Sequence, residues 1–304
     1  MFVVQPVVVT PSTLDASDVP ITETEWAAGT YTIGQQRYVG TTLYEVVVAS
    51  TTDEPTAGAA KPEPTWVRIG AINRFRMFDR VVGAPTVNPE KIEVEITPGQ
   101  IVNAIAFFGL QGQEVRIEVE DPVEGVVYDR TVVLIDDTGV INWFEYFFSD
   151  IEQLADLPLL DLRDLSLSDL PNYGTATFKI TIDAGAGTAE CGELVLGRQL
   201  PLGVATFGSR VGIEDFSRKE RDAFGGFEVV ERAFARRGEF SVMVENAAVD
   251  FVARTLSRLR ATPAVWVADE GRQATLIYGY VRDWNITYIA PTVSDLSLEI
   301  EGLT

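Results

Sequence analysis

Four aromatic side chains in the N-terminal quarter of the chain are the first candidates for chemistry. Trp26, Tyr31, Tyr44 and Trp66 recur between glycine-containing turns in residues 26–70. Trp and Tyr combine a flat apolar face with a polar edge, which suits stacking on a sugar ring. A domain this small also needs large side chains for its core. Three interpretations are therefore open: a structural core, a sugar-stacking surface, or a surface that docks on another protein.

A short basic and aromatic segment follows. Its candidate docking residues are Arg74, Phe75, Arg76, Phe78 and Arg80. In an acidic chain, such a segment could bind an acidic neighbour. The alternative is a linker whose two phenylalanines pack into the following domain.

Carboxylates are numerous, but their spacing predicts no catalytic pair. Aspartates gather in predicted loops: Asp121, Asp136, Asp137, Asp150, Asp156, Asp161 and Asp164. Paired carboxylates can hydrolyse a glycosidic bond or bind Ca²⁺. Neither the calcium spacing of an EF-hand nor a recognisable acid–base pair is present. The sequence therefore predicts no metal site.

The chain has no histidine and one cysteine, Cys191. This excludes Ser-His-Asp and Cys-His catalysis and imidazole-ligated zinc. We expect Cys191 to be a small buried residue, because a lone cysteine is far more often packed than reactive. With no phosphate-binding or dinucleotide motif either, we predict that the protein is not an enzyme.

The charge of the chain limits its partners. The formal net charge is −21, which disfavours direct binding of nucleic-acid phosphates. No stretch approaches the ~20 apolar residues of a membrane helix, so membrane insertion is not expected. Mixed-charge runs at residues 218–222, 231–232 and 236–237 are predicted to be solvated loops; in an oligomeric ring they could form ion pairs between subunits.

The elements that must position these residues are mainly strands. We predict a multi-domain, mainly β protein: an extended N-terminal arm at 1–20, loose in an isolated chain; a small aromatic β-module at 21–80; a jelly-roll-like β-sandwich at 81–200; and a β-rich domain at 201–304 with one helix. The prolines of residues 53–64 predict a loop.

Period-two alternation carries the sandwich prediction. Residues 92–96, 114–120 and 178–183 alternate apolar and polar side chains, as half-buried antiparallel strands do. Residues 103–110 are apolar almost throughout, which suits a strand buried on both faces. The leucine- and aspartate-rich residues 157–170 fit neither period and predict a surface excursion.

The C-terminal helix is predicted near 246–260. Val249, Val252, Leu256 and Leu259 fall on one face, Asn246 is its expected cap, and a proline at 263 ends it. The strands of this domain are expected at 227–233, 239–244, 264–268, 275–281, 284–290 and 296–300.

Two resemblances arise from these motifs. The glycine-separated aromatics ending in Trp66-Val-Arg-Ile-Gly70 resemble the small chitin- and cellulose-binding modules of bacterial chitinases. Residues 26–79 and 260–303 resemble tail and baseplate proteins of tailed bacteriophages. Residues 101–110, 126–129 and 192–197 resemble galactose-binding-like jelly rolls, a family in which a structural calcium is common.

The phage resemblance implies a structural virion protein in the distal tail or baseplate. It would be made in the host cytoplasm and would assemble in a ring of copies with other tail proteins. The alternative is a receptor-binding protein that recognises host-surface glycans through the aromatic module or the jelly roll. A tail-borne glycan hydrolase is a third, weaker alternative. No cofactor is implied other than that structural calcium.

Overall fold

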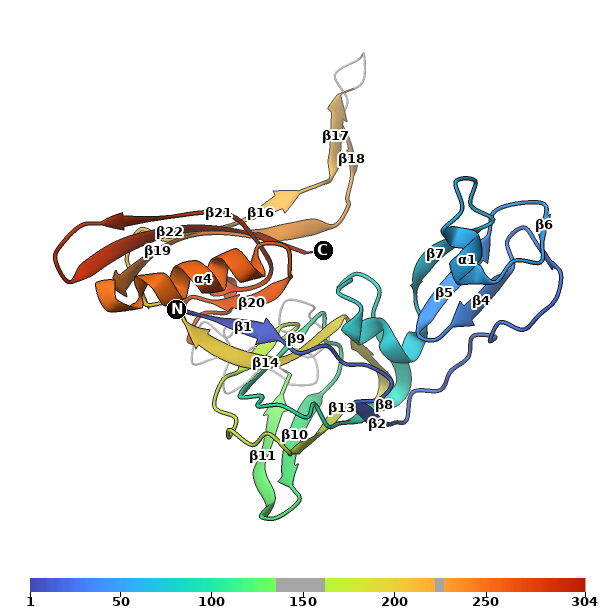
Figure 1. Cartoon of the computed structure of the whole chain (residues 1–304), viewed down its shortest axis with the longest axis horizontal. Helices are drawn as coiled ribbons and strands as arrows, with labels where there is room; N and C mark the ends of the chain where they lie inside the picture. The colour runs from blue at the N-terminus through green and yellow to red at the C-terminus, as the bar shows by residue number, and fades with distance from the viewer. Residues whose placement is uncertain (135–161, 222–226, 304) are drawn as a thin grey trace.

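The computed structural model describes residues 1–134, 162–221 and 227–303. Within these ranges the chain is mainly β, with two large sheets, three small sheets and short helices. The predicted mainly β, multi-domain fold is confirmed. Figure 1 shows a body of packed sheets that carries two projections, a small domain and a long hairpin. No helix in the described ranges is long and apolar enough to cross a membrane.

The largest sheet runs through the whole body and has ten strands. In spatial order these are β12 (Leu165–Leu167), β9 (Ala104–Phe108), β14 (Glu193–Pro201), β1 (Phe2–Pro6), β20 (Ala264–Val267), β21 (Leu276–Tyr288), β22 (Val293–Gly302), β19 (Phe234–Glu245) and β15 (Val204–Ala205), with β16 (Arg210–Asp215) also paired to β19. The sheet continues across the predicted domain boundary at residues 200 and 201.

The N-terminal strand lies in the middle of this sheet. β1 is antiparallel to both β14 and β20, with Val3 opposite Leu200 and Trp266. Residues 1–20 were predicted to be a loose arm in an isolated chain, and for β1 this is wrong. The strand is held because both its edges are paired, and Val3 and Val4 are buried.

A second sheet of five strands packs on one half of the large sheet. Its order is β11 (Gly125–Val133), β10 (Glu114–Asp121), β13 (Thr177–Cys191), β8 (Thr86–Ile96) and β2 (Leu14–Ser17). Ile92, Val94 and Ile96 enter one core together with Ile105 and Phe107 of β9. The alternation therefore predicted the inward face correctly. All residues of β9 are buried, as its apolar run predicted.

Helix α4 (Val249–Leu259) covers the other half of the large sheet, as Figure 1 shows. Val252 and Leu256 pack into a core with Trp266 and Leu298, so the predicted helix is confirmed. The predicted cap is wrong. Asn246 lies in the 3-10 turn η3 (Asn246–Ala248), where its side chain donates to the Ala290 carbonyl and accepts from the Ser294 hydroxyl.

The small domain contains a three-stranded sheet of β4 (Gln36–Val39), β5 (Thr42–Val46) and β7 (Trp66–Ala71), and a pair of β3 (Tyr31–Thr32) and β6 (Ser50–Thr51). The predicted loop at 53–64 contains the short helix α1 (Pro55–Ala59). The Glu54 carboxylate accepts from the Ala57 amide at 2.8 Å, and proline at the first helical position favours this start.

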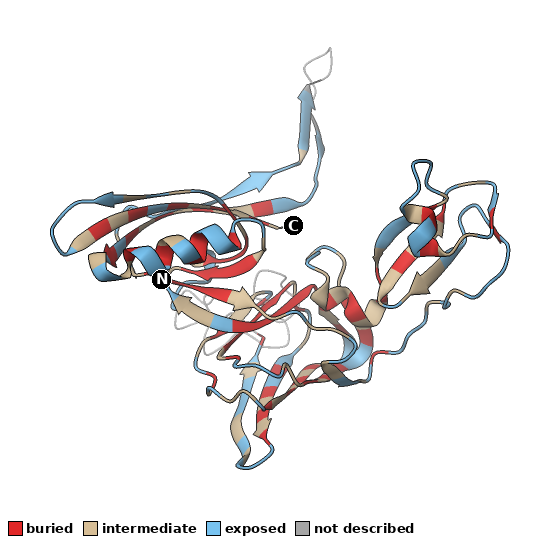
Figure 2. Cartoon of the chain, in the orientation of Figure 1, coloured by how far each residue is buried: buried red, intermediate tan, exposed pale blue. Residues whose placement is uncertain are grey.

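The leucine-rich residues 157–170 are only partly described, since 157–161 lie outside the described ranges. The rest is not a surface excursion. Residues 165–167 form β12, and Leu162, Leu167 and Leu170 are buried in the sandwich core. Figure 2 shows where burial occurs in the whole molecule. Buried residues follow the sheets of the body and one face of α4, and the long hairpin is almost wholly exposed.

Candidate functional site

The aromatic set forms the core of the small domain. Trp66 is 0% exposed and Tyr31 is 8% exposed. Their rings meet edge to face with centroids 5.4 Å apart. The Trp66 indole N–H donates to the Asp53 carbonyl, and the Tyr31 hydroxyl donates to the Ala27 carbonyl. These two rings are held by packing and hydrogen bonds, and they present no open stacking face.

Trp26 and Tyr44 differ from this pair. Both are half-buried and pack against the core that Tyr31, Val46 and Trp66 form. The Trp26 indole nitrogen is buried without a hydrogen-bond partner in the described chain. The Arg37 guanidinium lies 5.0 Å from the centroid of the Tyr31 ring. Of the predicted glycan-stacking candidates, Trp26 and Tyr44 are half-buried, whereas Tyr31 and Trp66 are buried.

The predicted docking segment forms the joint between the small domain and the body. It folds as the 3-10 helix η1 (Asn73–Phe78), in which Phe75 is buried and meets Phe78 edge to face at 6.2 Å. The Arg74 and Arg76 side chains donate to the backbone carbonyls of Val19 and Ala71. The structure thus brings Arg74, Phe75, Arg76 and Phe78 together, and their side chains make internal contacts.

Arg80 belongs to a different cluster, a buried polar site that the sequence did not reveal. Glu193, at the start of β14, is 3% exposed. Its carboxyl accepts from the Tyr278 hydroxyl in β21 and from the Arg80 amide, both at 2.9 Å. Burial is the main cause that raises the pKa of Glu193 to about 8. Burial also raises the pKa of Tyr278. This cluster connects the joint, the sandwich and the C-terminal half of the large sheet.

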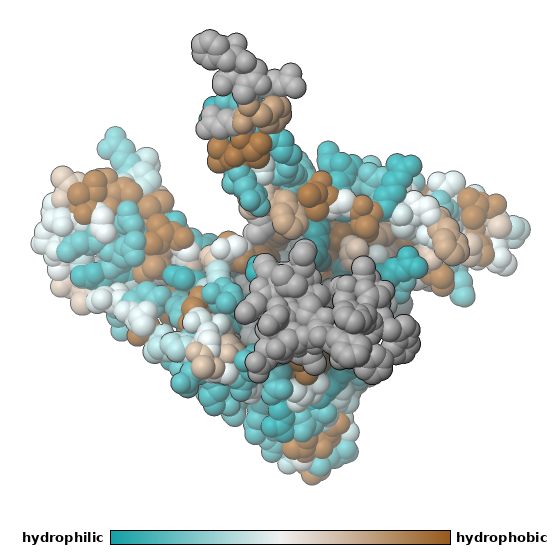
Figure 3. All heavy atoms as spheres, turned by 180° about the vertical axis from the view of Figure 1, so that it is seen from behind, coloured by the Kyte–Doolittle hydropathy of each residue, from teal (hydrophilic) through white to brown (hydrophobic). Residues whose placement is uncertain are grey.

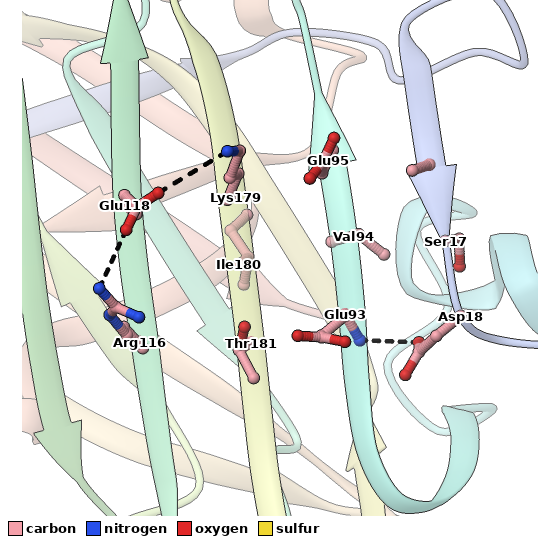
Figure 4. A pocket seen from close by; sticks show the side chains of 11 residues that line it. Ser17, Asp18, Glu93, Val94, Glu95, Arg116, Glu118, Lys179, Ile180 and Thr181 are labelled. Atoms are coloured by element: carbon pink, nitrogen blue, oxygen red, sulfur yellow. Dashed lines mark hydrogen bonds and ion pairs between the residues drawn. The ribbon is translucent and has the colours of Figure 1, made fainter. Parts of the chain in front are cut away.

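The outer face of the five-stranded sheet forms an open groove of about 380 Å³. Figure 4 shows Arg116 and Lys179 on neighbouring strands, both directed at Glu118, with N–O distances of 2.9 and 3.8 Å. Across the groove, the Glu93 amide donates to Asp18, whose carboxyl pKa is raised mainly by burial. Among the residues that the structure describes, no aromatic side chain lines this groove, so they offer no stacking surface for a sugar ring there.

The long hairpin carries several exposed apolar side chains. We call it the arm: β16, β17 (Arg218–Arg221), β18 (Phe227–Val230) and the residues that lead into β19. Residues 218–222 were predicted to be a solvated loop, but Arg218–Arg221 form a strand paired with β18. At the bend after β16, the Asp215 carboxylate accepts from the Ser217 amide at 2.9 Å. This Asx turn redirects the chain away from the body.

The arm carries apolar side chains that are not covered. The exposed residues are Val211, Ile213, Phe216, Val229, Val230 and Phe234, with Ile213 61% exposed. Figure 3 shows hydrophobic spheres on the arm. Two ion pairs lie within the arm: Lys219 pairs with Asp215 and Arg218 pairs with Glu220, each at 2.6 Å. β17 and β18 form a sheet of two strands, an arrangement that is marginal in water on its own.

The remaining candidates carry no site. Asp136, Asp137, Asp150, Asp156 and Asp161 lie outside the described residues. Asp121 accepts from the Val123 and Glu124 amides, and Asp164 pairs with Arg236. Among the described residues, no group of three or more potential ligands is arranged to hold a metal ion. Cys191 is buried, as expected, and burial raises the pKa of its thiol.

The fold and these surfaces define a mainly β protein with a sandwich, a sheet shared between its two halves, and two projections. No family model matches the sequence. No curated protein matches it either. Among solved structures, the chain is similar to a selenomethionine-labelled mutant of chitosan-binding module 1 from a chitosanase/glucanase of Paenibacillus sp. IK-5. The match has 10% identity and a TM-score of 0.25, and it covers 41% of this chain and 83% of that one. At this TM-score the likeness is weak, and nothing about the ligand of this chain follows from it.

Proposed function

We propose that this protein is a structural subunit of the tail or baseplate of a tailed bacteriophage, and that it assembles with copies of itself through the arm. The observation that carries the proposal is the row of exposed apolar side chains on a projecting two-stranded ribbon. Burying such side chains against a partner is favourable by roughly 25 cal/mol per Å² of apolar surface. The resemblance of residues 26–79 and 260–303 to tail proteins supplies the biological setting.

Self-association of the purified chain tests the assembly part. We expect oligomers in analytical ultracentrifugation at micromolar concentration, and a shift to monomers in an arm variant that combines Ile213→Lys with Val229→Lys. The matched control combines Val123→Lys with Val126→Lys, at two exposed valines on the β10–β11 hairpin. A monomeric parent protein, or an arm variant that associates as the parent does, overturns this part.

The virion part has a separate test. Gold-labelled antibody against the chain should decorate the distal tail of purified phage particles whose genome encodes it. If those particles lack the chain, the assignment to a virion fails even where the chain forms oligomers.

Receptor binding is the second candidate, and one observation favours it: Trp26 and Tyr44 are only half-buried in the small domain. A glycan array with the parent protein and the variants Trp26→Ala and Tyr44→Ala tests it. Binding that is lost in both variants supports a receptor role. If no glycan is bound, or if binding survives both substitutions, glycan recognition by this module is excluded.

A further inference from the structure

We infer that two copies of this chain join edge to edge at strand β16, antiparallel and around a two-fold axis at Gly212. The inference rests on the proposed function, because β16 is the base of the arm. It goes further in naming the strand, the register and the partner, which is a second copy of the same chain. A two-fold contact is isologous and closes at two copies, so it makes a dimer.

Strand β16 presents an unpaired edge. It pairs with β19 on one side, and no other described strand lies on its second side. All six residues of Arg210–Asp215 are exposed, so neither face of the strand is covered. The pairing with β19 is regular along this whole length, without a bulge. A regular edge of this kind is a template for a further strand.

The sequence of β16 is complementary to itself when two copies run antiparallel. With Gly212 opposite the same residue of the second copy, Arg210 lies opposite Glu214, and Val211 lies opposite Ile213, each twice. Opposite residues of an antiparallel pair lie on the same face and contact each other. Because side chains alternate along a strand, the two ion pairs lie on one face of the joined sheet and the two apolar pairs lie on the other.

Other arrangements of the same two strands are unfavourable. A shift of one residue places Val211 opposite Glu214, so the apolar pair is lost. A parallel pair in register places like charges side by side at positions 210 and 214, which is destabilising. Charged residues usually block a sheet edge against foreign strands. Here the two charges fit one register of one partner, a second copy of the chain.

Both charges of this pattern can reach a second copy. The Arg210 side chain is 81% exposed, and its ion pair with Glu239 is long, at 3.8 Å. Glu214 is exposed and forms no ion pair with any described residue. Ion pairs at such an exposed surface add little affinity. They select the register, and burial of Val211 and Ile213 supplies most of the affinity.

The distribution of charge favours contact at the arm over contact elsewhere. The chain has a formal charge of −21, so most surfaces of two copies repel each other. Residues 210–234 contain five basic and six acidic residues, so the arm is nearly neutral. Copies that meet at β16 therefore avoid much of this repulsion.

Charge reversal tests the register. Arg210→Glu alone, or Glu214→Arg alone, places like charges opposite each other in both halves of the symmetric pair. The dissociation constant from sedimentation should then rise about tenfold. The double variant restores opposite charges with their signs exchanged and should associate as the parent does. Arg68→Glu and Glu63→Arg make the same changes of net charge at exposed positions of the small domain and should have much smaller effects. Circular dichroism checks that each variant is folded.

A covalent cross-link gives a second measurement. A Cβ atom added at Gly212 meets nothing within 4 Å, so Gly212→Cys can be accommodated. Opposite Cα atoms of an antiparallel pair are about 4.5–5.5 Å apart, a spacing that a disulfide can bridge. Oxidation with diamide should therefore give a covalent dimer. The native Cys191 is buried and does not compete. Val126→Cys, at an exposed position of the β10–β11 hairpin, should stay monomeric on a non-reducing gel.

The outcomes separate the inference from the proposed function. If the parent forms oligomers and the arm variant does not, but the double charge variant fails to regain association or Gly212→Cys gives no covalent dimer, the arm assembles through another surface and the inference falls alone. If the parent chain is a monomer, the assembly part of the proposed function fails, and the inference fails with it. Regained association together with a covalent dimer supports the pairing, whatever the labelling of phage particles shows.

Discussion

At the scale of single residues, the buried carboxyl of Glu193 has the clearest solution consequence. Its two hydrogen-bond donors come from Tyr278 and Arg80, on two other parts of the chain. Burial raises its pKa from 4.5 to about 8, although the two hydrogen bonds act in the opposite direction. The folded protein therefore keeps this proton over a pH range in which the unfolded chain has lost it.

We predict that Glu193→Gln reduces the loss of stability with rising pH. In the parent protein, the contribution of Glu193 is complete below about pH 4.5 and is lost as the pH rises to about 8. The free energy of unfolding should fall by about 5 kcal/mol through this group over that window. A glutamine has no proton to lose, and its side-chain oxygen can still accept from the Arg80 amide.

Chemical denaturation from pH 5 to 8.5 measures this slope. Glu63→Gln is the matched control, because Glu63 is exposed. Equal slopes for the two variants would show that the general repulsion of an acidic chain, and not the buried carboxyl, governs the pH dependence.

A second residue-scale prediction concerns Gly58, which packs against the Trp66 ring. A Cβ atom at Gly58 would lie 2.5 Å from Trp66 Cδ1 and 2.5 Å from Thr65 Oγ1. Because the ring is fully buried and cannot move freely, Gly58→Ala should destabilise the small domain by about 1–3 kcal/mol. Thermal unfolding followed by tryptophan fluorescence measures this. Gly29→Ala, where the nearest neighbours of an added Cβ atom lie at 3.9 Å, should be nearly neutral. If the two substitutions lower the stability equally, the close contact between Gly58 and Trp66 is not the cause.

At the scale of elements, β1 determines whether the body unfolds as one unit. It is the strand between β14 of the sandwich and β20 of the C-terminal half. We therefore expect a single cooperative unfolding transition for the body. Val3→Ala should lower the stability of that transition by about 1–3 kcal/mol, because it leaves a cavity at the centre of the sheet.

The control is Val8→Ala at an exposed position just after β1. Differential scanning calorimetry of the two variants gives the comparison. Two separate transitions for the body, with Val3→Ala shifting only one of them, would mean that β1 does not couple the halves.

Helices and strands with a clear periodicity of apolar residues were predictable from the sequence, but the elements against which they pair or pack were not. The alternation at 92–96 and the stripe of Val252, Leu256 and Leu259 fixed which side chains are buried, since periodicity reports orientation. Pairing order depends on contacts far apart in the sequence, so the place of β1 could not be predicted. Of the arm, the strand predicted at 227–233 includes β18, but β17 was missed because its charged residues form ion pairs along the ribbon and look like a loop in the sequence.

The candidate site residues, too, could be predicted only in part from the sequence. The spacing of Trp26, Tyr31, Tyr44 and Trp66 located a compact aromatic domain, but only the structure shows that Tyr31 and Trp66 fill its core. Glu193 gave no signal, because a glutamate at the start of an apolar strand looks like a solvated strand end. Asn246 is a good capping residue, yet the nearby start of β22 offers Ser294 as another partner.

At the scale of the whole molecule, net charge and the apolar arm make opposite contributions to self-association. Copies with a formal charge of −21 repel each other, and salt screens this repulsion over about 10 Å at 0.1 M. Burial of apolar side chains is not weakened by salt. We predict that raising NaCl from 20 mM to about 500 mM lowers the dissociation constant of the oligomer several-fold.

Sedimentation velocity at a series of salt concentrations checks this, with the arm variant as the control that stays monomeric throughout. If association instead weakens with salt, ion pairs dominate the interface, and the mixed-charge residues of the arm rather than its valines and phenylalanines hold the copies together.

The position of β1 also has a consequence for how the chain is made. β1 pairs with β20, which lies far downstream in the chain and is therefore synthesised much later than β1. The large sheet cannot close until β20 has been synthesised, and until then the edges of β14 and β1 are open to other chains. Copies translated close together are thus exposed to strand exchange before each body is sealed. Chaperone demand and slow maturation should accompany this topology, whatever the finished molecule binds.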